Sequence, residues 1–122
     1  MTDDKPALKS QECVIHAPIE AIYRAFVEAA MLREWLGLDL DLVLELGGKY
    51  VLEREGVPLL DGSIGVLAWP EALAVSAGEQ SFELKLVADF GATTAHVSSR
   101  GMACFDGALE RLEAYMTRAG RR

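Results

Sequence analysis

The sequence predicts an α+β domain in which an antiparallel sheet is covered by a long C-terminal helix. Residues 82–88 alternate apolar and polar side chains, and this period of two is typical of a strand with one buried face. Residues 105–116 instead repeat their apolar side chains every three or four positions, as an amphipathic helix does. Short segments with glycine or Trp69-Pro70 separate the later strands, so we expect neighbouring strands to be antiparallel.

A strand and two short helices are predicted first. Residues 8–16 suit a strand, and Pro18, with a fixed φ and no N–H, suits the first position of a helix. The apolar stripe of that helix consists of Ile19, Ile22, Tyr23 and Phe26. A second helix ends at Gly37 and carries a stripe of its own: Met31, Leu32, Trp35 and Leu36.

The rest of the predicted sheet follows these helices. Residues 40–46 place a leucine at every second position, which makes this segment the clearest strand in the sequence. Gly47 and Gly48 can adopt positive φ and turn the chain into a second strand at 49–54. Further strands are expected at 60–68, 72–77, 81–89 and 93–99.

The last element is predicted to be a helix from about Met102 to Ala119. Its apolar stripe, formed by Phe105, Leu109, Leu112 and Met116, is the large apolar set expected to cover the dry face of the sheet.

Size and composition restrict the class of protein. The 122 residues suit one compact domain, which we expect to span residues 7–120 after a disordered tail at 1–6. The formal net charge of -7 would repel a phosphate backbone, so nucleic acid is not an expected partner. No apolar run reaches the roughly 18 residues of a membrane span and the start lacks a signal-peptide pattern, so we expect no membrane partner and a cytoplasmic location. Cys13 and Cys104 form no CxxC pair and are expected to be free thiols.

Signals for catalysis are weak. Only two histidines are present, His16 and His96, and neither stands near a candidate nucleophile in the sequence. No cluster has the spacing of metal ligands, and Gly47-Gly48 lacks the pattern of a phosphate-binding loop. We therefore predict no catalytic residue, no metal and no cofactor.

Several segments, in this order and spacing, resemble the SRPBCC superfamily of START-like, helix-grip proteins. Residues 15–26 are similar to its opening strand, Ala-Pro-x-Glu turn and first helix, and residues 31–36 to its second helix ending in Trp. Gly47-Gly48-Lys49-Tyr50 resembles its hairpin, 69–73 its proline-containing turn, and 109–116 its C-terminal helix. Within the superfamily the resemblance is to the branch of the activator of Hsp90 ATPase homologue 1. The link at 99–101 is shorter than in that branch, and Phe105 replaces the aromatic residue of its Gly-Trp pair.

The resemblance implies a curved antiparallel sheet wrapped around the C-terminal helix, with a cavity between them for a small hydrophobic or amphipathic molecule. The side chains expected to line this cavity are Trp35, Tyr50, Trp69, Phe82, Phe105, Leu109 and Leu112. A domain of this size also needs most of these side chains to close-pack its core, with or without a ligand.

Three polar side chains are candidate ligand contacts. Arg54 and Arg100 are the cations placed best to meet a carboxylate, because each interrupts or follows a strand. His96 shares a strand face with Thr94 and Ser98, which is either a polar cavity wall or the wet side of the sheet.

Two other functions stay open. One is a protein-interaction module similar to a co-chaperone, acting as a homodimer or with another protein through its acidic surface. The other is a cavity enzyme that uses a single acid or base group, against which the lack of paired acid and base residues argues.

Overall fold

The computed structural model describes residues 7–119, and the tail predicted at 1–6 lies outside these described residues. They form an α+β fold with one seven-stranded antiparallel sheet, ordered β1-β7-β6-β5-β4-β3-β2, and three helices. The strands are β1 (Lys9–Ile15), β2 (Asp39–Leu42), β3 (Lys49–Arg54), β4 (Val57–Ala68), β5 (Ala72–Ala77), β6 (Gln80–Asp89) and β7 (Ala92–Arg100). The helices are α1 (Ile19–Val27), α2 (Ala29–Leu36) and α3 (Ala108–Ala119), with a short 3₁₀ turn, η1 (Ala103–Phe105), before α3.

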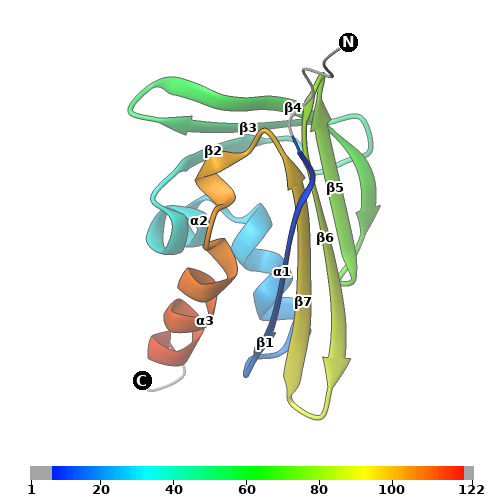
Figure 1. Cartoon of the computed structure of the whole chain (residues 1–122), viewed down its shortest axis with the longest axis vertical. Coiled ribbons are helices and arrows are strands. Elements are labelled where there is room, and N and C mark those ends of the chain that lie inside the picture. Colours follow the sequence, from blue (N-terminus) through cyan, green and yellow to red (C-terminus); the bar gives the residue numbers. More distant parts are fainter. Residues whose placement is uncertain (1–6, 120–122) are drawn as a thin grey trace.

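The sheet bends around the helices, which all lie on one side of it (Figure 1). Figure 1 shows β2 and β3 running across the top of the molecule, at a steep angle to β6 and β7. Along β7 the side chains alternate strictly: Thr93, Ala95, Val97 and Ser99 are buried and the residues between them are partly exposed. The concave face of the sheet therefore holds the core, as the alternation in the sequence predicts.

Side-chain hydroxyl and indole groups attach α1 to the sheet and α2 to α1. The hydroxyl of Tyr23 on α1 donates a hydrogen bond to the carbonyl oxygen of Ala72 on β5 (3.0 Å), and the hydroxyl of Tyr50 on β3 donates to that of Phe26. The indole nitrogen of Trp35 donates to the carbonyl oxygen of Ala25 (2.7 Å). These buried aromatic side chains thus contribute apolar area without leaving their polar atoms unpaired.

The final helix is shorter than the sequence predicts. The prediction that it begins near Met102 is wrong: α3 begins at Ala108, and Phe105 lies in the preceding turn η1. Asp106 has an extended backbone and Gly107 has a φ of 69°, so the helical hydrogen-bond pattern is interrupted before Ala108. Phe105 still points into the core and is fully buried, which explains why it matched the spacing of the stripe.

The strand predicted at 40–46 is also shorter, because β2 ends at Leu42. The chain then folds back tightly: the N–H of Gly48 donates to the carbonyl oxygen of Glu45 (2.9 Å), and the N–H of Gly47 donates to that of Ile64 on β4 (2.8 Å). Leu44 and Leu46 consequently lie on the surface, 52% and 68% exposed. Their alternation with polar residues continued that of the strand, although their backbone belongs to a turn.

We predict that Gly48→Ala destabilises the fold and that Gly65→Ala does not. A β-carbon at Gly48 would lie 2.1 Å from the carbonyl oxygen of Val43, a backbone atom that cannot move away alone. At Gly65, also in the sheet region, a β-carbon meets nothing within 4 Å. Urea unfolding should show a loss of about 1–3 kcal/mol for the first variant, typical of overpacking. Equal stability of the two variants would contradict the tight turn.

Candidate functional site

Most of the predicted lining residues do come together, and they fill the space between the sheet and α3. Tyr50, Phe82 and Phe105 form a continuous aromatic row, with ring centroids 5.3 Å apart in the first pair and 4.8 Å apart in the second. Leu109 and Leu112 on α3 are 2% and 0% exposed. These side chains pack against one another as a core.

The two tryptophans lie apart from this row. Trp35 is buried between α1 and the final helix, with its ring 5.2 Å from that of Phe26. Trp69, which the sequence places in the lining, is instead 52% exposed. Its ring packs edge-on against that of Tyr23 at 5.0 Å and lies beneath the guanidinium of Arg24 at 5.7 Å, so it covers the middle of α1.

The candidate polar contacts on β7 lie on the outer face of the sheet. His96 is paired across the strands with Glu12, with 3.1 Å between the imidazole Nδ1 and the carboxylate oxygen. Arg100 follows the same alternation and is exposed. The face shared by Thr94, His96 and Ser98 is therefore the solvent-facing side of the sheet and not a polar cavity wall.

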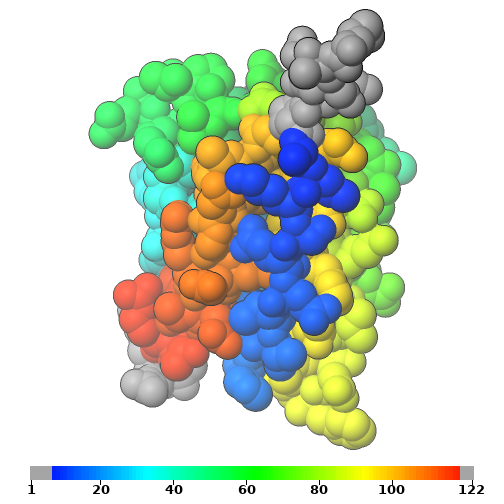
Figure 2. Space-filling model, viewed as in Figure 1, coloured from blue at the N-terminus to red at the C-terminus, as the bar shows by residue number. Residues whose placement is uncertain are grey.

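Arg54 lines a surface hollow of about 400 Å³ at the end of the molecule where the β3–β4 hairpin meets the segment before α3. We call it the arginine hollow. Its lining consists of Arg54, Leu59, Gln80, Gly101, Met102, Ala103, Cys104 and Arg111. Figure 2 shows the β3–β4 hairpin projecting at the upper left, beyond the surface formed by residues 101–107 and α3.

Local structure fixes the position of each side chain in the hollow. Arg54 is the last residue of β3, directly before the turn at Glu55-Gly56. Arg111 lies in the first turn of α3 and donates a hydrogen bond to the carbonyl oxygen of Asp106 (3.3 Å). The side-chain amide of Gln80 donates to the carbonyl oxygens of both Leu59 (2.9 Å) and Gly101 (3.1 Å), and so ties the two sides of the rim together.

Neither arginine of the hollow forms an ion pair with a described carboxylate, and the same is true of Arg118 on α3. Five basic side chains form ion pairs with carboxylates: Lys9, Arg24, Arg33, Lys49 and Lys85. Within residues 7–119, no carboxylate lies within 4.0 Å of Arg54 or Arg111. The hollow is therefore a positive site on a protein whose net charge is -7.

The two cysteines lie in opposite electrostatic surroundings. Burial raises the pKa of the Cys104 thiol, while Arg54 and Arg111 lower it and Asp106 raises it by smaller amounts. Burial also raises the pKa of Cys13, and there the neighbouring carboxylates of Glu113 and Glu110 raise it further. Both thiols are free, and Cys104 forms part of the floor of the arginine hollow.

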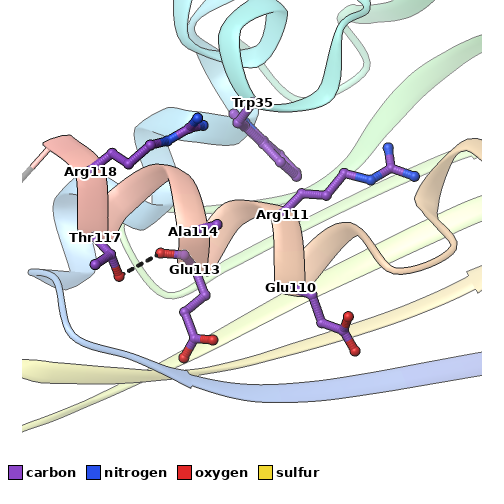
Figure 3. Close-up of a pocket in the computed structure, with 7 residues that line it drawn as sticks. All are labelled: Trp35, Glu110, Arg111, Glu113, Ala114, Thr117 and Arg118. Carbon is purple, nitrogen blue, oxygen red and sulfur yellow. Dashed lines mark hydrogen bonds between the residues drawn. The ribbon is translucent and has the colours of Figure 1, made fainter.

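A second hollow of about 490 Å³ lies between α2 and α3 (Figure 3). Figure 3 shows Arg111 and Arg118 on the same side of α3 as Trp35, whereas Glu110 and Glu113 leave the opposite side of the helix. The acidic and basic side chains of α3 are thus segregated. Arg111 lines both the second hollow and the arginine hollow.

Comparison with known proteins shows the fold and nothing finer. No protein family and no curated protein matches the chain. A conserved protein of unknown function from Enterococcus faecalis superposes with a TM-score of 0.76 at 17% identity, over 91% of this chain and 71% of that chain. A protein from Cytophaga hutchinsonii superposes with a TM-score of 0.75 at 15% identity, over 98% of this chain and 100% of that chain. The Aha1 dimer from Colwellia psychrerythraea superposes with a TM-score of 0.64 at 15% identity, over 75% of this chain and 74% of that chain.

These neighbours make the α+β fold compatible with that of SRPBCC and Aha1-like proteins. Among the described residues, no helix is long and apolar enough to cross a membrane.

Sequence reasoning found one member of the arginine hollow, Arg54, and missed the others. Arg111, Gln80, Met102 and Cys104 belong to no binding motif in the sequence. In the structure Arg54 pairs across the hairpin with Val57 on β4, so no carboxylate stands opposite it. The convergence with Arg111 depends on how the link between β7 and α3 folds.

We predict that Leu109→Trp lowers stability, because Leu109 is buried in the core cluster. Overpacking a filled core typically costs about 1–3 kcal/mol, whereas Leu109→Met keeps the volume and should cost less. Urea unfolding of both variants measures the difference. A tryptophan variant as stable as the wild type would show unfilled space between the sheet and α3.

We also predict that the two cysteines differ in their preference between anionic iodoacetate and neutral iodoacetamide. The thiolate is the reactive form at both sites, so the ratio of the two rates at one cysteine cancels its pKa. The ratio should be several-fold higher at Cys104, beside the arginines, than at Cys13, beside Glu110 and Glu113. Peptide mass spectrometry after partial alkylation gives both ratios. Equal ratios would contradict a positive potential in the hollow.

Proposed function

We propose that the chain binds a small amphipathic molecule in the arginine hollow, where the β3–β4 hairpin meets the segment before α3. We also infer that it belongs to the SRPBCC superfamily, in the branch of the activator of Hsp90 ATPase homologue 1. The sequence motifs and the compatible fold support this membership. The proposal keeps the class of ligand that the sequence resemblance implies and places it at the mouth of the helix-grip fold, because aromatic side chains fill the interior.

The observation that carries the proposal is the combination of apolar and polar walls in one hollow of suitable size. Binding sites for small molecules typically measure about 300–1,000 Å³, and this hollow measures about 400 Å³. Leu59 and Met102 supply apolar surface, and two guanidinium groups supply polar contacts. Such a site suits a molecule with an apolar part and a polar head.

Binding is favoured over catalysis by what lines the hollow. No carboxylate and no imidazole is among the described residues that line it, so paired acid and base groups are missing there. The pKa of the Cys104 thiol is raised by burial, which disfavours the nucleophilic thiolate. These groups can hold a molecule, but they are a poor set for proton transfer.

We expect amphiphiles with a chain of eight carbons to shift the backbone amide signals of residues 101–105 in heteronuclear NMR spectra. The series would consist of n-octanol, octanoate and octyltrimethylammonium, so that binding is detected whatever the charge of the head. Ala103→Trp should abolish the shifts, because Ala103 is exposed and its replacement fills the hollow without disturbing the core.

The matched control is Ala114→Trp, which places the same ring on an exposed alanine of the other hollow, between α2 and α3. It should leave the shifts unchanged. If no member of the series shifts these amides, or if the control variant abolishes the shifts equally, the proposed site is wrong.

A further inference from the structure

We propose that the ligand of the arginine hollow is an amphipathic monocarboxylate, with its carboxylate between Arg54 and Arg111 and a short apolar tail against Leu59 and Met102. This inference rests on the proposed function and names the chemical class of its ligand. It follows from the charge, the geometry and the hydrogen-bond donors of the hollow.

The charge of the hollow opposes that of the whole protein. An anion approaching a protein of net charge -7 is repelled by most of its surface, so a site for it needs local cations that no carboxylate neutralises. Arg54 and Arg111 meet this requirement within the described part of the chain. The carboxylate of Asp106 raises the pKa of Cys104, and Lys9 donates hydrogen bonds to its two oxygens at 3.3 and 3.4 Å.

The geometry brings the two cations to one place from separate elements. Arg54 comes from the end of β3 and Arg111 from the first turn of α3, and both act on the thiol of Cys104 in the floor of the hollow. Two like charges brought together in this way repel each other. An anion placed between them removes that repulsion and gains a charge-assisted hydrogen bond from each guanidinium.

The donors that remain in the hollow favour a carboxylate head. The side-chain N–H groups of Gln80 already donate to the carbonyl oxygens of Leu59 and Gly101. The two guanidinium groups are therefore the charged side-chain donors that the lining offers to a ligand. Each guanidinium presents a planar pair of N–H groups that matches the two oxygens of a carboxylate. A single carboxylate therefore satisfies the hollow.

The apolar side of the hollow accounts for the tail. Leu59 is partly exposed in the hollow, beside Met102, which is 4% exposed, and both pack with the core. An alkyl or aryl tail on the carboxylate would cover this surface and gain hydrophobic free energy that acetate cannot gain. The hollow should thus distinguish an amphipathic acid from a simple anion.

The test compares the dissociation constants of octanoate, n-octanol, acetate and octyl phosphate, measured by NMR titration of the intact protein. We expect octanoate to bind about tenfold more tightly than n-octanol, since each exposed ion pair contributes up to about fivefold. Acetate should bind too weakly to saturate. Added salt should weaken the binding of octanoate and leave that of n-octanol unchanged.

Variants assign this preference to the two arginines. Arg54→Gln and Arg111→Gln should each lower the affinity for octanoate several-fold and leave that for n-octanol unchanged. Arg118→Gln is the matched control, because it removes the same charge from the same helix but outside the hollow, and it should change neither. Arg54 lies at a strand end on the surface, so its variant tests the inference even if Arg111→Gln disturbs α3.

The outcomes separate the inference from the proposed function. Equal affinities for octanoate and n-octanol, or an equal loss in Arg118→Gln, would overturn the inference and leave the proposed function standing. If acetate bound as tightly as octanoate, the inference that an apolar tail contributes to binding would be wrong. If octyl phosphate bound much more tightly than octanoate, the inference that the head group is a carboxylate would be wrong. If none of the amphiphiles binds, the proposed function itself falls.

Discussion

The packing of Phe105 against Phe82 is the contact on which the rest of the site depends. Phe105 is fully buried although it lies in a three-residue turn, and its ring extends the aromatic row that begins at Tyr50. The side-chain amide of Gln11 on β1 donates to the carbonyl oxygen of Phe105 (2.6 Å), and its oxygen accepts from the N–H of Leu109 (3.3 Å). These contacts fix the link between β7 and α3, and with it Met102, Cys104 and the start of α3.

The filled interior changes where a ligand is to be sought. In a curved sheet that wraps a helix, the space between them can be either a cavity or a core, and here aromatic and leucine side chains occupy it. Two hollows of the described structure lie at the margins of the fold, where elements meet. A third, of about 420 Å³, lies on the sheet and is lined by residues of β4, β5 and β6. The short link at residues 99–101 contributes to this arrangement because it brings η1 directly onto the end of the sheet.

Electrostatics distinguishes the arginine hollow from the rest of the surface. Most described basic side chains are neutralised by neighbouring carboxylates, so their fields are weak beyond the first contact. Arg54 and Arg111 are not neutralised in this way. The hydrogen bonds of Gln80 to Leu59 and Gly101, and that of Arg111 to Asp106, fix the lining of the hollow around them. A local positive site on an acidic protein favours anions over the surrounding surface, because its two guanidinium groups offset the general repulsion there.

The sequence by itself determined the element order, the antiparallel sheet and the face that each helix buries. These properties follow from local periodicity: the strands β3 and β5 end where glycine or a change of alternation ends the pattern, and α2 ends at Gly37, whose φ is 74°. The periodicity gave wrong element ends where the alternation or the stripe of side chains continued beyond the end of the strand or helix. Leu44 and Leu46 continued the alternation of β2 into a turn, and Phe105 continued the stripe of α3 into a segment that is not part of that helix.

Only the tertiary structure decided the candidate site. Whether Tyr50, Phe82 and Phe105 line a cavity or fill it depends on how closely the sheet approaches α3, and residue types do not encode that distance. The meeting of Arg54 with Arg111 likewise requires the bend of the sheet and the interruption of the helix before Ala108. Sequence patterns report the environment along one element, whereas a binding site is made by side chains from several elements whose separation is set by packing.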